Sequence, residues 1–361
     1  PTVVSQVTND TTPTVTGTVT LGPGESLAVT INGTTYTTSS GLTITGNNWS
    51  VTLPTTAEGT YSVTATVTNA ATMTTSDLTN NELVIDTTAP ATPTVISQST
   101  NDTTPVISGK ATLAAGETLT VTVNGATYTV TPDSNGNWSI DTATATPTSG
   151  TLGTFVDGQS YPVTATVTDA AGNTASDTTT NELVIDTTAP VAPAVIGQTT
   201  NDTTPVISGT ALVAPGETLT VTVNGATYTV VPDSNGNWSV DTGTDVPSSG
   251  TLGTFVDGTS YPVTATVTDA AGNSATDTTT NELKIDTTPP ATPTVISQVT
   301  NDTTPTVKGT VNLAAGDTLA VTINGVTYTT SSGLTITGNN WEVTLPTTAD
   351  GTYAVSYTHL T

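Results

Sequence analysis

The chain has 361 residues, of which 29 are acidic and three are basic, and its formal net charge at pH 7 is −26. It lacks the cations that neutralise phosphate groups, so we exclude nucleic acid and anionic membrane surfaces as its partners. It contains no cysteine, which excludes disulfides and thiolate metal sites. No apolar run approaches the roughly 20 residues of a membrane helix, so we expect no membrane insertion in this segment. Because the sequence begins within a repeated pattern, we expect it to be a piece of a longer protein.

The sequence consists of four tandem repeats. The string TNDTTP begins at residues 8, 100, 200 and 300, and NELVIDTTAP, slightly altered in its last copy, begins at residues 81, 181 and 281. A period of about 100 residues is typical of one domain per repeat rather than of a solenoid coil. We therefore predict four domains, of which the two middle ones are longer: residues 1–90, 91–190, 191–290 and 291–361.

Each repeat carries the period-two pattern of β-strands. In the second repeat, apolar residues alternate with threonine at Leu119–Val123 and at Tyr161–Val167, which indicates strands with threonine on the solvent face. Asn124-Gly125 predicts a hairpin turn. In chain order we predict seven strands in this repeat: near Thr94–Ser97, from Val106, from Thr118, from Thr127, at Trp138–Asp141, at Tyr161–Thr168, and ending at Ile185. Seven short antiparallel strands in about 100 residues predict an all-β fold, with tandem immunoglobulin-like β-sandwich domains in an extended array.

Differences between the copies indicate which side chains form the core. Lys284 stands where the first two repeats have Val84 and Val184, so this position is expected to face water. Its neighbours, Leu183 and Ile185 in the second repeat, are then expected to face the core. We interpret the single tryptophan of each repeat as a core residue, with stacking on a sugar as the functional alternative: Trp49, Trp138, Trp238 and Trp341.

Alternating strand directions bring most acidic side chains to the two ends, or poles, of each sandwich. Where the second repeat meets the third, Asp102, Asp157 and Asp186 would face Glu217 and Asp269. Carboxylates gathered without a protein cation repel one another, and Ca2+, which takes roughly six to eight oxygen ligands, would offset that repulsion. Turn formation by the same Asp and Asn residues is the alternative. The candidate calcium ligands are the acids of these loops and hinges: Asp86, Asp102, Asp157, Asp169, Asp186, Asp202, Glu217, Asp257, Asp269 and Asp286.

Taken together, the strings IDTTAP, TNDTTPVISG, VNG and VTATVTDAAGN resemble the bacterial immunoglobulin-like repeats of giant repetitive adhesins and biofilm-associated surface proteins. The resemblance implies an extracellular stalk stiffened by calcium at its junctions, with neighbouring repeats as partners and a host or abiotic surface bound by regions outside this chain. It also implies pairs between a hinge acid and the acid of the last loop, Asp86 with Asp169 and Asp186 with Asp269. The first repeat departs from this pattern, because Asn69 replaces the loop acid.

Two other function classes need to be considered. A nucleophile–base pair needs a His, Lys or Cys, and the three lysines occupy unrelated repeat positions, so we expect no enzyme. Direct binding of a glycan or of ice by the threonine-rich strand faces is the alternative function. The high β propensity of threonine explains the same pattern.

The fourth repeat is expected to be incomplete. Its alternation ends after Val355, and the only histidine, His359, lies in the break. We expect this repeat to be cut within its sixth strand and to be the least stable, with residues 356–361 not native. The hinge at Asp286 would then hold its metal most weakly.

Overall fold

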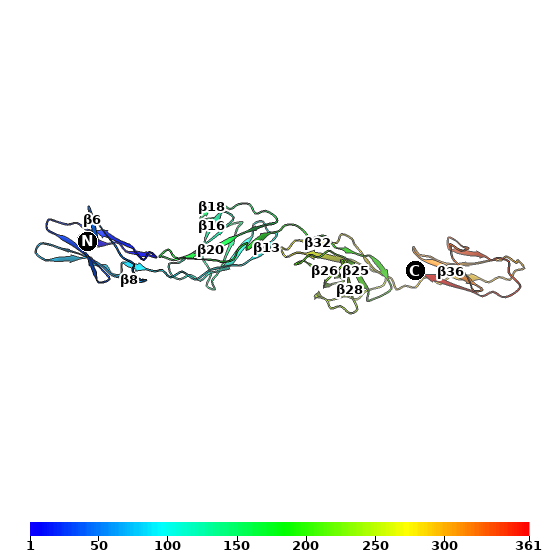
Figure 1. Ribbon diagram of the computed structural model, residues 1–361. Helices are drawn as coiled ribbons and strands as arrows, with labels where there is room; N and C mark the ends of the chain where they lie inside the picture. Colours follow the sequence, from blue (N-terminus) through cyan, green and yellow to red (C-terminus); the bar gives the residue numbers. More distant parts are fainter. Residues whose placement is uncertain (361) are drawn as a thin grey trace. The chain divides into compact units, whose positions relative to one another are not determined.

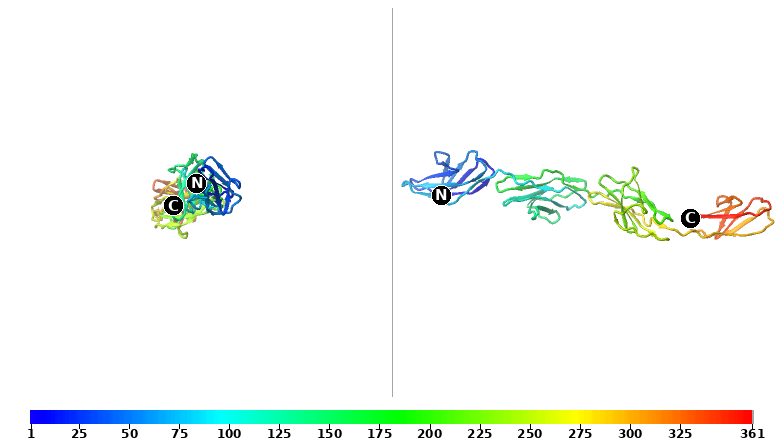
Figure 2. Two further views of the ribbon diagram at one scale, coloured as in Figure 1. Left: turned by 90° about the vertical axis from the view of Figure 1, so that its left-hand side faces the viewer. Right: turned by 90° about the horizontal axis from the view of Figure 1, so that it is seen from below.

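The computed structural model describes residues 1–360. All of the regular structure in this range is β-strand, and the range contains no helix long and apolar enough to cross a membrane. Contacts divide the chain into two compact units, one of residues 1–190 with 268–274 and the other of residues 191–267 with 275–361. Each unit holds two β-sandwiches with separate cores. Some of their strands are labelled in Figure 1, and Figure 2 shows the ribbon from two further directions.

The first unit contains strands β1–β22. Those of its first sandwich are β1 (Thr2–Val3), β2 (Gln6–Thr8), β3 (Thr14–Thr18), β4 (Ser26–Ile31), β5 (Thr34–Tyr36), β6 (Leu42–Thr45), β7 (Asn48–Thr52), β8 (Gly59–Tyr61), β9 (Val63–Thr68), β10 (Thr74–Ser76) and β11 (Leu83–Ile85). Those of its second sandwich are β12 (Thr94–Val95), β13 (Gln98–Thr100), β14 (Val106–Lys110), β15 (Thr118–Val123), β16 (Ala126–Val130), β17 (Asn137–Asp141), β18 (Ser149–Gly150), β19 (Gln159–Tyr161), β20 (Val163–Thr168), β21 (Thr174–Ser176) and β22 (Leu183–Ile185).

Two layers enclose the core of the second sandwich. One layer is the sheet β12-β14-β17, and the other combines the sheets β18-β16-β15-β20-β21 and β13-β22-β19. The predicted sixth strand is wrong as a single strand, because it breaks at Pro162: β19 pairs with β22, whereas β20 pairs with β15. Proline has no N–H to donate to a ladder. The predicted first strand, near Thr94–Ser97, ends early at Val95 as β12, which pairs with β14. A separate strand that was not predicted, β13, follows it and pairs in parallel with β22 in the other layer.

Burial confirms the predicted core. Leu183 and Ile185 are 1% and 0% exposed, and all four tryptophans are buried. The Asn124-Gly125 hairpin is confirmed as well, since both residues have positive φ and join β15 to β16.

A glycine makes room for each tryptophan. Gly109 in β14 pairs with Trp138 in β17, and a Cβ added to Gly109 would lie 2.4 Å from Trp138 Cζ2 and 2.0 Å from the Thr94 carbonyl oxygen. Contacts this short do not occur, so close sheet packing requires glycine here. The same crowding recurs at the equivalent positions of the other repeats: Gly17, Gly209 and Gly309.

The second unit contains strands β23–β40. Those of its first sandwich are β23 (Ala194–Val195), β24 (Gln198–Thr200), β25 (Val206–Thr210), β26 (Thr218–Val223), β27 (Ala226–Val230), β28 (Asn237–Asp241), β29 (Ser249–Gly250), β30 (Ser260–Tyr261), β31 (Val263–Thr268), β32 (Ser274–Thr276) and β33 (Leu283–Ile285). Those of its second sandwich are β34 (Thr294–Ile296), β35 (Thr306–Thr310), β36 (Thr318–Ile323), β37 (Val326–Tyr328), β38 (Leu334–Thr337), β39 (Asn340–Thr344) and β40 (Val355–Leu360). Lys284 in β33 is exposed, as predicted.

The end of the fourth repeat forms a strand in spite of its altered sequence. Strand β40 pairs with β36 along its length, from Val355 opposite Ile323 to Leu360 opposite Thr318. His359 therefore takes the place of a core-facing valine. Its Nε2 lies 2.9 Å from Asp317 Oδ2, and only 5% of its side chain is exposed. The loss of sequence alternation after Val355 does not interrupt the strand.

Candidate junction site

The loop between β20 and β21, residues 168–174, is held closed by its own side chains; we call it and its copy at residues 268–274 the junction loops. Asp169 Oδ1 accepts a hydrogen bond from the Asn173 backbone N–H at 2.9 Å, and Asp169 Oδ2 accepts one from Asn173 Nδ2 at 2.8 Å. The bond from the Asn173 side chain lowers the pKa of Asp169, and burial opposes this more weakly. Asp169 therefore shapes the loop through its negative charge.

This loop bonds to the hinge that leaves the first repeat. Asn173 Nδ2 also donates to the backbone oxygen of Asp86 at 2.8 Å, and the Asn9 backbone N–H donates to the oxygen of Ala171 at 3.1 Å. The expected pair of Asp86 and Asp169 is thus linked through an asparagine amide. Ala171 is 9% exposed, so this tip of the loop is covered.

The second junction loop, which belongs to the first compact unit, makes the same two bonds. Asn273 Nδ2 donates to the backbone oxygen of Asp186 at 2.8 Å and to Asp269 Oδ2 at 2.8 Å. The Asn101 N–H donates to the oxygen of Ala271 at 3.1 Å. Burial acts to raise the pKa of Asp269, but the hydrogen bonds from Asn273, Ala271 and Gly272 together outweigh it, and the pKa lies below its usual value.

A second acid fixes the hinge that follows each repeat. Asp157 Oδ1 accepts from the Thr187 N–H at 2.6 Å, and Asp157 Oδ2 accepts from Thr188 Oγ1 at 2.9 Å. The Thr187 N–H bond is the main cause that lowers the pKa of Asp157. The same clamp is formed by Glu58 on Thr87 and Thr88 and by Asp257 on Thr287 and Thr288.

Only part of this clamp follows from the sequence prediction. Strand parity places Asp157 at the pole of its hinge, and this placement agrees with the structure. The Thr-Thr pair of the hinge resembles a stiff linker in the sequence, and Glu58 is absent from the predicted ligands. A signal for the clamp exists, since an acid followed by glycine lies 29 or 30 residues before the first hinge threonine in each of these repeats: Glu58-Gly59, Asp157-Gly158 and Asp257-Gly258.

Other predicted calcium ligands stay within their own turns. Asp102 Oδ1 accepts from the N–H of Thr104 at 2.8 Å, and Asp202 bonds Thr204 in the same way. Glu217 Oε2 accepts from the Ala214 N–H at 2.7 Å. These bonds are those of ordinary turn chemistry, the alternative drawn from the sequence.

The hinge acids themselves are bonded locally. Asp86 and Asp186 each accept from the N–H of the threonine two residues later, and Asp286 Oδ2 lies 3.2 Å from Lys284 Nζ. Within residues 1–360, no three His, Cys, Asp or Glu side chains are grouped so that they could hold a metal ion. The carboxylates brought to the junctions accept hydrogen bonds from N–H and O–H donors of the protein. Calcium binding stays a prediction.

The sequence prediction also did not include a buried glutamate that occurs in each of the first three repeats. Glu182 is 1% exposed, and its Oε2 accepts from the Val163 N–H at 2.9 Å, directly after the Pro162 break. Its Oε1 is buried without a partner, as are those of Glu82 and Glu282. The signal was the constant Glu of the NEL string, whose side chain serves the strand break rather than a junction.

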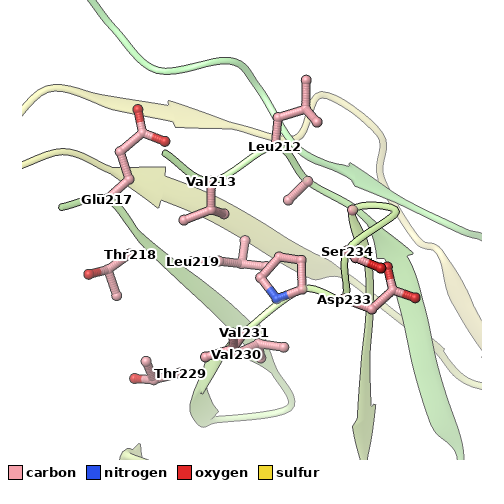
Figure 3. A pocket seen from close by; sticks show the side chains of 13 residues that line it. Leu212, Val213, Glu217, Thr218, Leu219, Thr229, Val230, Val231, Asp233 and Ser234 are labelled. Atoms are coloured by element: carbon pink, nitrogen blue, oxygen red, sulfur yellow. The ribbon is translucent and has the colours of Figure 1, made fainter. Parts of the chain in front are cut away.

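The third repeat has an open apolar groove of about 440 Å³ (Figure 3). Leu212 and Val231 border it where the second repeat has Thr112 and Thr131. The polar side chains that line it are Glu217, Thr218, Thr229, Asp233 and Ser234. This lining contains two acids and three hydroxyls but no histidine, lysine or cysteine to activate a nucleophile.

Comparison with known proteins gives one family. The sequence model described as "Bacterial Ig-like domain" matches residues 92–187 and 196–287. No curated protein sequence matches the chain. Among solved structures, a 1.5-MDa bacterial ice-binding adhesin shares 27% identity, with 79% of this chain and 97% of that chain covered and a TM-score of 0.32. Titin fragment I67–I69 shares 10% identity, with 79% and 96% covered and a TM-score of 0.35. TM-scores this low carry no information on function.

Proposed function

The chain belongs to the bacterial Ig-like domain family, and from this premise we propose that it is a structural spacer segment of a secreted or cell-surface bacterial adhesin. In this role the repeats separate a surface-binding region, which lies elsewhere in a longer chain, from the cell. They would thereby support adhesion or biofilm formation. Ig-like repeats are typically structural or adhesive modules rather than enzymes, and neighbouring repeats would be the direct partners of this segment.

The observation that carries the proposal is the repeated bonding of a junction loop to a hinge. Asn173 with Asp86 and Asn273 with Asp186 use the same atoms at the same 2.8 Å distance. A binding or catalytic site needs to occur only once in a chain. Polar contacts that recur at successive hinges are instead what a spacer requires.

The threonine-rich faces give less support to direct ligand binding. Thr122 Oγ1 lies 2.9 Å from Thr127 Oγ1, and Thr166 Oγ1 lies 2.8 Å from Ser176 Oγ. Hydroxyls that pair with one another across strands have fewer bonds to offer a glycan or ice. We therefore favour the spacer.

The proposal is tested by replacing this segment, in the longer protein displayed on cells, with four unrelated Ig-like domains of similar length. A spacer predicts that adhesion is retained after replacement and falls when the segment is deleted. Loss of adhesion after replacement would show that these repeats bind the surface directly. Calcium is tested separately, by isothermal calorimetry of the purified chain with CaCl2.

A further inference from the structure

We infer that the junction between the first two repeats is an interlocking surface closed by the Asn173 amide, and that it needs no metal ion. The inference rests on the proposed spacer function, because a fixed contact between repeats matters only where the repeats must hold a set orientation to one another. It concerns residues of the first compact unit alone.

The atoms around Asn173 define the chemistry of this lock. Its Nδ2 lies 2.8 Å from the Asp86 backbone oxygen and 2.8 Å from Asp169 Oδ2. Both of these neighbours are acceptors only, so the group between them must be the NH2 rather than the amide oxygen. An NH2 has two protons, and each is used once. A cation bridging the same two oxygens would have to displace this donor.

A second hydrogen bond between the two repeats is formed by the backbone alone. The Asn9 N–H donates to the oxygen of Ala171 at 3.1 Å, two residues before Asn173. Gly172 between them has φ +92, a conformation in which glycine is favoured. The string DAAGN therefore supplies one acceptor, one left-handed turn and one donor in a fixed order.

The partner that this loop fits is the pole of a preceding repeat with TND and ID strings. The first repeat has Met73 where the second has Asn173, and Met73 is 67% exposed and offers no side-chain donor. Its own loop therefore cannot form the amide bond with a repeat that precedes it. The third repeat contains the same TND and ID strings, with Asn201 and Asp286. The pole that they form therefore fits a following repeat that carries DAAGN.

The test measures the distance between two spin labels in the full chain by double electron–electron resonance. The chain has no cysteine, so Thr38→Cys and Thr146→Cys, both at exposed positions, place one label in each of the first two repeats. The distribution is recorded in excess Ca2+ and in EGTA for the parent, Asn173→Ala and Asn173→Asp. Asn47→Asp is the matched control, because it adds the same charge at an exposed position in the turn between β6 and β7 of the first repeat.

The lock predicts a narrow parent distribution that is equal in Ca2+ and EGTA. Both Asn173 variants should increase the population outside the main peak roughly tenfold, since a paired, partly buried donor is lost. Asn173→Asp should do so even in Ca2+, because its new carboxylate repels Asp169, and Asn47→Asp should change nothing. Circular dichroism checks that each variant is folded. If Asn173→Asp does not fold, the distribution of Asn173→Ala alone decides the test.

Three results would overturn the lock. The first is a parent distribution that broadens in EGTA. The second is an Asn173→Ala chain whose distribution stays as narrow as that of the parent. The third is an Asn173→Asp chain that stays narrow in Ca2+, as expected if a new carboxylate completes a calcium site. The spacer function fails differently, through a parent mean distance so short that the two repeats must fold back on each other.

Discussion

Replacing Gly109 with alanine should destabilise the second repeat and leave the others unchanged. The new Cβ would lie 2.0 Å from the Thr94 oxygen and 2.4 Å from Trp138 Cζ2, so either β12 leaves β14 or the indole moves. Overpacking a tight core costs about 1–3 kcal/mol. With a urea dependence of about 1–3 kcal/mol per molar, the midpoint of this repeat should fall by about 1 M.

The assay uses the single tryptophan of each repeat. The chain labelled with 5-fluorotryptophan has four fluorine signals, and only that of Trp138 should shift its urea midpoint. The matched control is Gly197→Ala, because a Cβ there meets nothing closer than 3.6 Å and the second repeat has Ser97 at this position. An unchanged Trp138 midpoint, or an equal shift for Trp238 in the control, would refute the packing argument.

Three further predictions concern polar groups. Glu182→Ala should lower the urea midpoint reported by Trp138, because it leaves the Val163 N–H unpaired at a cost of about 1–3 kcal/mol. Glu182→Gln keeps an acceptor and should be tolerated. Equal losses of stability for both variants would contradict this. Stability should hold between pH 8 and 5 and fall below about pH 4, since hydrogen bonds lower the pKa of Asp133, Asp157 and Asp169 in the folded state and protonation must then break those bonds. Acid titration followed by circular dichroism checks this, and unfolding that begins near pH 6 would argue against it. Asp157→Asn should increase proteolysis at the hinge after Asp186 relative to Asp141→Asn, and equal cleavage would show that the clamp is not needed.

Sequence patterns predicted the parts of this fold that depend on local periodicity. Alternation identified Val121 as a core residue, and Asn124-Gly125 identified a hairpin, because each depends on backbone conformation within a few residues. Strand parity placed Asp157 near the hinge and Asp169 near the preceding one. These are statements about which end of a sandwich a loop occupies, and parity determines them.

The partners of each carboxylate could not be predicted in this way. Whether Asp169 meets a cation or an amide depends on where Asn173 Nδ2 lies to within a few tenths of an ångström. An asparagine beside acids suggests an oxygen ligand for a metal, whereas in the structure the Asn173 nitrogen faces the acids. Likewise, the break at Pro162 follows from strand pairing with two different neighbours, which a period of two does not reveal.

Small-angle X-ray scattering of the purified chain tests the spacer proposal most directly. Four sandwiches of roughly 35–40 Å each, set end to end, give a length of about 150 Å and a radius of gyration of about 43 Å. A compact globule of this chain length would have a radius of gyration of about 21 Å. The account predicts the larger value, unchanged by EGTA. A value near the smaller one would contradict the spacer, and a fall on adding EGTA would contradict the metal-free lock.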